Sequence, residues 1–347
     1  MPTSFPRRSL VLSALALPAL AACSGGADPS GVDGSTESGD FAPTSVKHIY
    51  GTTKIPAAPT KIATISWVNA DTLLALGLIP VGMPAVEWGG NANKSTDWID
   101  AKLDELGAGW DSGKAPTLYS EADGINFDEI AALTPDLIIG AYSGLAKEDY
   151  DKLAKIAPTI GPLAPNYTAP WEEVLAAVGT ATGLADKATA LREKLSTDLK
   201  KVGEDNPAVA GATFIAGSLT LSDHKISLYA AGDTRPRFFT ALGMTQADVV
   251  TKNTKDSSTF SFDWSAERAD ELVSDVLYTW AAKGDTIQTF QKDPLFSTIP
   301  AIAKGALVLT ADDHETLAIS AASALSLPWA LEHIVPSVIT AAEKSGS

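Results

Sequence analysis

Four aromatic residues and a histidine each follow a segment that is predicted to be a buried β-strand. They are Trp67, Trp88, Tyr142, Trp280 and His314. In open α/β sheets, ligands bind outside the carboxyl ends of the strands. Aromatic rings gathered at that edge suit a cleft that stacks on a planar or chelating ligand. For each ring taken alone, packing in the core is an equally good interpretation.

Two arginines, Arg235 and Arg237, lie at the start of a predicted helix. Cations are disfavoured at a helix N-terminus, so their placement needs a reason. An anion in front of the helix would supply one, because backbone N–H groups and guanidinium forks would all point at it. The alternative is that these arginines pair with acidic residues nearby.

The sequence argues against an enzyme. His314-Glu315 begins like the zinc-protease motif but lacks the second histidine, and no Gly-x-Ser-x-Gly or phosphate-binding loop occurs. The chain has only four histidines, without the spacing of metal ligands. We therefore expect neither a catalytic centre, nor a protein-held metal site, nor a cofactor.

Strands that alternate with helical patterns must position these residues. Before residue 170 the predicted strands are 61–66, 80–84 and 136–141, and after residue 205 they are 212–216, 275–280 and 306–310. Such alternation predicts parallel sheets with both faces covered. Between the two groups, residues 170–204 carry an apolar stripe at helical spacing, with Pro170 at the first helical position and a break expected near Gly183. The predicted fold is thus α/β, with two Rossmann-like lobes (45–169 and 205–347) that have parallel sheets and are joined by a single long α-helix (170–204).

Internal similarity supports two lobes of like construction. Residues 126–139 and 265–278 share one pattern of short helix, turn and strand at an offset of 139, and 74–78 matches 240–244 at an offset of 166. The alternative is that any two α/β halves share such patterns.

The first 44 residues are predicted to lie outside the fold. Residues 1–22 have the charged start and short apolar run of a signal peptide, and 23–44 form a flexible tether rich in Gly and Ser. The sequence Leu-Ala-Ala-Cys ending at Cys23, the only cysteine, resembles the lipobox of bacterial lipoproteins, in which this cysteine is lipidated. Arg7-Arg8 leaves both the twin-arginine and the general export route open.

The formal net charge is −16, and removal of residues 1–22, which carry two arginines and no acid, makes it two units more negative. Such a charge argues against nucleic acid or anionic lipid as a partner.

Four stretches of the sequence together resemble the helix-hinged (class III) periplasmic substrate-binding lipoproteins of iron-siderophore ABC importers. They are residues 54–62, 71–82, 133–139 and 327–331. The resemblance spans about residues 46–339. It implies a monomeric protein that is lipid-anchored on the outer face of the bacterial cytoplasmic membrane. This protein would capture a ferric siderophore between its lobes and deliver it to an ABC permease with its ATPase. Haem or cobalamin is the alternative ligand.

The resemblance also implies roles for individual residues. An acid on each lobe would dock on the permease, and these map onto Asp128 and Glu267, with Glu129 as an alternative to Asp128. Tyr119 and Phe260 fall where relatives place cleft residues in loops. If the ligand were haem, Tyr119, Tyr142 or His314 could supply the axial ligand. A helical hinge predicts modest lobe rearrangement on binding.

Overall fold

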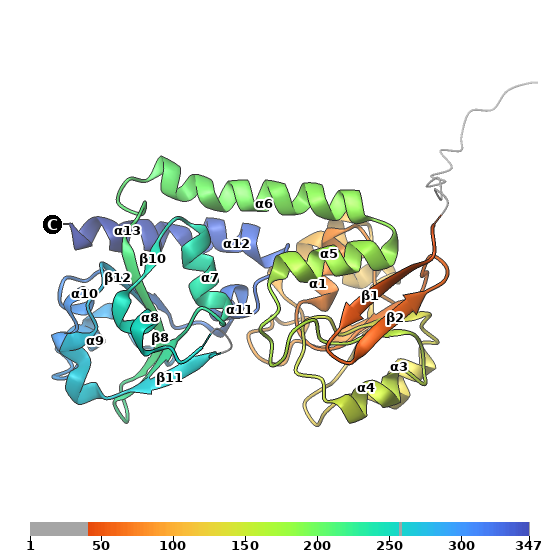
Figure 1. The fold of residues 1–347 in the computed structure, drawn as a ribbon, viewed down its shortest axis with the longest axis horizontal. Helices are drawn as coiled ribbons and strands as arrows, with labels where there is room; N and C mark the ends of the chain where they lie inside the picture. Colours follow the sequence, from red (N-terminus) through yellow and green to blue (C-terminus); the bar gives the residue numbers. More distant parts are fainter. Residues whose placement is uncertain (1–40, 257–258, 347) are drawn as a thin grey trace, which may run out of the picture. The chain divides into compact units, whose positions relative to one another are not determined.

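The computed structural model describes residues 41–256 and 259–346, which belong to one compact unit (Figure 1). The predicted signal peptide, Cys23 and most of the tether lie outside these residues. Among the described helices, none combines the length and apolar character needed to cross a membrane.

The N-terminal lobe is built on a five-stranded sheet in which all strands are parallel. In spatial order these are β5 (Thr117–Tyr119), β4 (Gly82–Pro84), β3 (Ile62–Thr64), β6 (Leu137–Ile139) and β7 (Thr159–Ile160). The predicted strands at 61–66, 80–84 and 136–141 are confirmed as β3, β4 and β6, whereas β5 and β7 were not predicted. The surrounding elements are α1 (Asn69–Ala75), α2 (Asp97–Glu105), η1 (Trp110–Ser112), α3 (Phe127–Ala132), α4 (Lys147–Leu153) and the antiparallel hairpin β1 (Thr44–His48) and β2 (Gly51–Ile55).

The C-terminal lobe contains a six-stranded mixed sheet. Its parallel part comprises β10 (Thr245–Gln246), β8 (Thr213–Thr220), β12 (Val276–Trp280) and β13 (Leu307–Thr310). Strand β10 pairs with the start of β8 on the edge away from β12. Along the same edge β8 pairs with the antiparallel strand β9 (Lys225–Tyr229), which in turn pairs antiparallel with β11 (Ser261–Trp264). The parallel sheet predicted for this lobe is thus present, and antiparallel strands extend it because β8 turns back into β9 through a tight turn.

Short helices complete this lobe. They are α7 (Thr234–Ala241), α8 (Asp248–Asn253), η2 (Ala266–Glu271), α9 (Ile287–Lys292), η3 (Phe296–Thr298), α10 (Pro300–Ala303), α11 (Asp313–Ser320), α12 (Ser326–His333) and α13 (Val335–Ser345).

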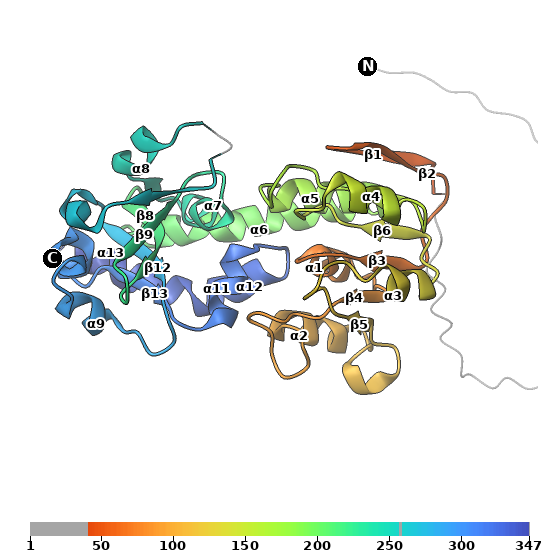
Figure 2. The same ribbon diagram turned by 90° about the horizontal axis from the view of Figure 1, so that it is seen from below.

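The predicted linking segment forms two helices, of which the second connects the lobes. Helix α5 (Trp171–Thr182) ends at Gly183, whose φ of 73° is left-handed, and α6 (Ala185–Asp205) follows. The break near Gly183 is confirmed, but Pro170 is the N-cap and not the first helical residue. A Cβ on Gly179 would lie 2.5 Å from that of Ala188, so this glycine lets α5 and α6 pack closely. Helix α6 alone runs from one lobe to the other (Figure 1; Figure 2).

One hydrophobic core continues through both lobes. Ile62 and Leu137 of the N-terminal sheet, Leu199 of α6, and Phe214 and Val276 of the C-terminal sheet belong to the same cluster of buried residues. The neighbouring strand residues Ile138 and Leu277 face the other side of each sheet, where they join separate, smaller cores. Each sheet is therefore covered on both faces, as predicted, and the lobes share their larger core.

The repeat of 139 residues is also visible in the hydrogen bonds. Asp136 Oδ2 accepts hydrogen bonds from the N–H and hydroxyl of Thr60, both at 2.8 Å. Asp275, 139 residues later, accepts the same two bonds from Thr213, both at 2.7 Å. In each lobe, an aspartate that precedes one central strand thus holds the start of the neighbouring strand.

These aspartates should stabilise the fold unequally. We expect Asp275→Ala to lower the free energy of unfolding by about 2 kcal/mol, because two charge-assisted bonds are lost at a half-buried site. Asp136→Ala should cost about 1 kcal/mol, since this carboxylate is exposed. Urea denaturation measures both. Asp205→Ala, in an exposed pair with Lys201 on α6, is the control and should change stability by less than about 0.5 kcal/mol. Equal effects of all three substitutions would contradict the proposed role.

Candidate ligand-binding site

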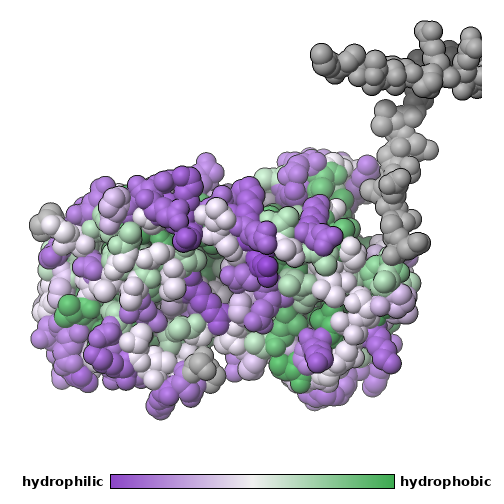
Figure 3. All heavy atoms as spheres, turned by 45° about the horizontal axis from the view of Figure 1, so that its top comes forward, coloured by the Kyte–Doolittle hydropathy of each residue, from purple (hydrophilic) through white to green (hydrophobic). Residues whose placement is uncertain are grey.

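Three exposed aromatic side chains are candidates for contact with a ligand. Among the described residues, Trp67 is 46 % exposed, Phe260 39 % and Tyr167 37 %, whereas most aromatic residues are buried or half-buried. The face shown in Figure 3 is mostly hydrophilic, with hydrophobic residues in small separate patches. Exposed aromatic rings on such a surface indicate a binding site.

Five rings form a continuous group, here called the aromatic cluster, which crosses from one lobe to the other. Within the N-terminal lobe, the ring centroids of Trp67 and Trp88 are 6.3 Å apart, those of Trp67 and Tyr167 5.8 Å, and those of Tyr142 and Tyr167 5.6 Å. Trp280 of the C-terminal lobe meets Trp88 edge to face at 6.0 Å. The structure thus brings together four of the residues singled out from the sequence and adds Tyr167.

The backbone that presents Trp67 is held in an unusual conformation. Both neighbours of Trp67, Ser66 and Val68, have left-handed φ angles of 60° and 53°. Such angles are costly for residues other than glycine, and they persist where the surroundings enforce them. The fully buried side chain of Asn69 does so, because its amide donates to the carbonyls of Ile65 (2.7 Å) and Tyr142 (2.9 Å). One side chain therefore fixes the turns that carry two members of the aromatic cluster.

His314 supports the cluster from the C-terminal lobe. Its Nδ1 donates to the carbonyl of Gly89 at 2.7 Å, so it holds the loop that carries Trp88. The imidazole also packs against Trp98 and Trp329, at centroid distances of 4.8 and 5.2 Å. His314 therefore lies in the contact between the lobes. It supports the aromatic cluster through the Trp88 loop and is not itself one of the five rings.

Buried hydrogen bonds also cross between the lobes. Asp71 of α1 accepts one bond from Trp98 Nε1 (2.8 Å) and one from the hydroxyl of Ser323, which follows α11 (2.7 Å). Burial raises the pKa of the Asp71 carboxyl.

Nearby, the Thr234 hydroxyl donates to the Ser320 carbonyl at 2.6 Å, and the Tyr142 hydroxyl lies 3.5 Å from the same oxygen. Burial raises the pKa of Tyr142, and the charged side chains at the start of α7 are close enough to affect it as well.

Arg235 lies at the site, but its charge is compensated within the protein. Both carboxylate oxygens of Asp233, the N-cap of α7, accept bonds from its guanidinium, at 2.8 and 2.5 Å. The guanidinium stacks 3.5 Å from the ring centre of Tyr229, and Phe260 lies 5.8 Å away. Of the two sequence interpretations, pairing with a nearby acid is the one that the structure shows for this residue.

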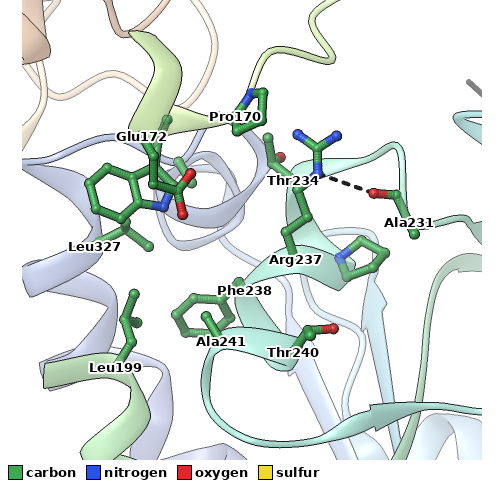
Figure 4. Close-up of a pocket in the computed structure, with 13 residues that line it drawn as sticks. Pro170, Glu172, Leu199, Ala231, Thr234, Arg237, Phe238, Thr240, Ala241 and Leu327 are labelled. Atoms are coloured by element: carbon green, nitrogen blue, oxygen red, sulfur yellow. Dashed lines mark hydrogen bonds between the residues drawn. The ribbon is translucent and has the colours of Figure 1, made fainter. Parts of the chain in front are cut away.

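Arg237 points elsewhere. Its Nη1 donates to the carbonyl of Thr168 at 2.8 Å and its Nε to that of Ala231 at 3.1 Å, so it ties α7 to the segment before α5. It lines a cavity of about 380 Å³ with mostly apolar neighbours from α5, α6, α7 and α12, among them Leu199 and Phe238 (Figure 4). None of the rings in the aromatic cluster lines this cavity. Arg235 and Arg237, which the sequence analysis grouped together, therefore lie in different surroundings.

Phe260 and Tyr119 have different surroundings. Phe260 packs edge to face on Tyr229, with centroids 6.4 Å apart, in the loop before β11. Tyr119 instead ends β5 and is buried in the N-terminal lobe, where its hydroxyl donates to the Thr64 carbonyl. The expectation that Tyr119 lies in a loop was wrong, because its segment adds an edge strand to the sheet.

A polar cavity of about 270 Å³, here called the Glu121 cavity, opens beside the aromatic cluster. Glu121, Asp149, Ser66, Ser143 and Tyr167 line it with apolar and glycine neighbours. Glu121 Oε2 accepts the N–H of Ser66 at 2.9 Å, while its buried Oε1 has no partner among the described residues. Burial raises the pKa of Glu121 to about 7. Sequence inspection missed this residue, which lies just after an unpredicted strand.

The described residues contain no group of three or more His, Cys, Asp or Glu side chains arranged to hold a metal ion. The chemistry that the site offers is therefore stacking on rings and hydrogen bonding to polar groups of a bound molecule.

The raised pKa of Glu121 predicts a pH-dependent cost. Since the folded protein binds this proton more tightly than the unfolded chain, the wild type loses stability as pH rises from about 4.5 through 7. Replacing Glu121 by Gln removes the buried charge. The gain in unfolding free energy relative to wild type should therefore be larger at pH 8 than at pH 5, by about 1 to 3 kcal/mol. Urea denaturation at both pH values measures it, with exposed Asp123→Asn as the control. If Glu121→Gln changed the free energy of unfolding by the same amount at pH 5 and pH 8, the raised pKa of Glu121 would be contradicted.

A family model described as "Periplasmic binding protein" matches residues 62–313. The probable siderophore-binding lipoprotein YfiY of Bacillus subtilis (strain 168) is 33% identical over 258 residues, which are 72% of this chain and 72% of that protein. The putative ABC transporter substrate-binding lipoprotein YhfQ of the same organism is 28% identical over 266 residues, covering 72% and 74% of the two chains.

Among solved structures, PiaA of Streptococcus pneumoniae TIGR4 in complex with ferrichrome matches with a TM-score of 0.77 and 28% identity, over 86% of this chain and 99% of that one. The match of family and fold covers both lobes and the helix that links them. By sequence and by architecture, this chain belongs to the periplasmic binding proteins.

Proposed function

We propose that this protein captures a ferric siderophore at the aromatic cluster and delivers it to an ABC permease and its ATPase. The observation that carries the proposal is a group of rings, partly exposed, to which both lobes contribute. It is a substrate-binding protein and not an enzyme, in keeping with its family. PiaA, whose structure was solved with ferrichrome, supports a ferric siderophore as the ligand class.

Haem, the alternative from the sequence, is less well supported by the side chains. Its candidate axial ligands were Tyr119, Tyr142 and His314. Both tyrosines are buried, and the Tyr119 hydroxyl is engaged by a backbone carbonyl. His314 uses Nδ1 for the Gly89 carbonyl, and its Nε2 is buried 3.5 Å from Asp97 Oδ2. None of the three offers a free ligand atom to an open cleft.

Docking on the permease is proposed to use Asp128 and Glu267. Asp128 lies in the first turn of α3 and Glu267 in the first turn of η2, and both are exposed. Because α3 and η2 occupy matching positions in the 139-residue repeat, each lobe presents one acid from the same structural element. Exposed acids so placed suit basic residues on a partner.

Delivery to the permease also implies attachment to the membrane. We propose that Cys23 carries the lipid anchor and that the protein acts as a monomer on the outer face of the cytoplasmic membrane. The relatives YfiY and YhfQ are described as lipoproteins, which supports this location.

Ferric chelates should quench the tryptophan fluorescence of the protein, and Trp67→Ala should weaken binding about tenfold or more. The reason is that an exposed ring loses its stacking contact with the ligand. The measurement is a fluorescence titration with a panel of ferric hydroxamate, catecholate and carboxylate chelates.

Trp110→Ala is the control for this titration. The Trp110 indole donates to Asp100 and makes no contact with the aromatic cluster, so affinity should be unchanged. A Soret shift with added haem and no response to any chelate would overturn the ligand class. Equal affinity of wild type and Trp67→Ala would remove Trp67 from the site.

A further inference from the structure

The Glu121 cavity has an unbalanced charge. Its lining includes two acids, Glu121 and Asp149, and no lysine, arginine or histidine. Asp149 has a counter-ion, because Lys152 Nζ lies 3.0 Å from its carboxylate. Glu121 has none among the described residues, and only the Ser66 N–H bonds to it. Buried carboxylates are normally paired, so an unpaired one beside a binding site calls for a partner from outside.

Neither arginine of the neighbouring region lines the Glu121 cavity. Arg235 is paired with Asp233 through two bonds, and Arg237 donates to two backbone carbonyls. The cavity itself therefore holds no arginine that could bind an anionic group of a chelate. Its uncompensated charge is negative and lies on the N-terminal lobe.

On the basis of the proposed function, we propose that the Glu121 cavity is a subsite for a protonated amine of the ferric chelate, for which Glu121 supplies the counter-charge. The ammonium donates to the carboxylate that the protein leaves unpaired, while the rest of the chelate lies against the aromatic cluster. Tyr167, which is exposed and belongs to both the cavity and the cluster, joins the amine subsite to the rings.

Proton binding at Glu121 then competes with the amine. The pKa of about 7 means that the carboxyl is mostly ionised at pH 8 and mostly neutral at pH 6. The other titratable side chains at the cavity are Asp149, which shares Lys152 with Glu148, and Tyr167, while Tyr119 is buried in the core close to Glu121. A cationic chelate should therefore bind more tightly at pH 8 than at pH 6.

The test uses three ferric trihydroxamates that differ only at one end: ferrioxamine B, with a terminal ammonium, and its N-acetyl and N-succinyl derivatives, which are neutral and anionic there. Fluorescence titration at pH 8 should give ferrioxamine B about tenfold or more tighter binding than the acetyl form, with the succinyl form weakest. Glu121→Gln should abolish the preference for ammonium and leave the acetyl form within about twofold of wild type. Lowering the pH to 6 should reduce the preference in the wild type only.

Asp123→Asn removes an exposed charge two residues away and should leave the order of affinities unchanged. Equal or tighter binding of the acetyl or succinyl form, or a preference that survives Glu121→Gln, would overturn the subsite while leaving siderophore binding intact. Binding of other ferric chelates with none of these three would overturn it as well. Failure of every ferric chelate to bind would instead remove the proposed function, and the subsite with it.

Discussion

The structure depends on a core that the two lobes share. Strand residues of both sheets and Leu199 of α6 belong to one cluster of buried side chains, so the lobes cannot separate without exposing apolar surface. At the edge of this core, Asp71 is buried between Trp98 of its own lobe and Ser323 of the other. Withdrawal of either donor would remove one of the two side-chain hydrogen bonds to this buried carboxyl, which is costly. The relative position of the lobes is thus fixed by apolar burial and by polar groups that need each other.

This constraint explains how rings from separate lobes form one site. Trp280 can meet Trp88 only while the lobes keep their position, and His314 holds the Trp88 loop from across the boundary. On the other side, Asn69 fixes the turns that present Trp67 and Tyr142. The aromatic cluster is therefore formed before any ligand arrives, which lowers the cost of ordering it on binding. Charge is placed unevenly at this site, since Arg235 is paired with Asp233 whereas Glu121, among the described residues that line its cavity, has no counter-ion.

The sequence predicted what depends on local pattern. Buried strands such as 136–141 and the break at Gly183 follow from hydrophobic periodicity and glycine, and the rings at strand ends follow from α/β topology. Features that arise from tertiary packing could not be predicted. Strand β9 is antiparallel because of a four-residue turn, and α5 packs back on α6 because Gly179 allows close approach. Likewise, the partner of Arg235 and the isolation of Glu121 depend on rotamers and burial, which no spacing in the sequence encodes.

Solution scattering of the protein with and without a saturating ferric chelate tests the shared core most directly. A preformed site on lobes that cannot part predicts a radius of gyration that is the same in both samples within experimental error. A clear decrease on binding would show that the free lobes stand open and close around the ligand, and would contradict the account.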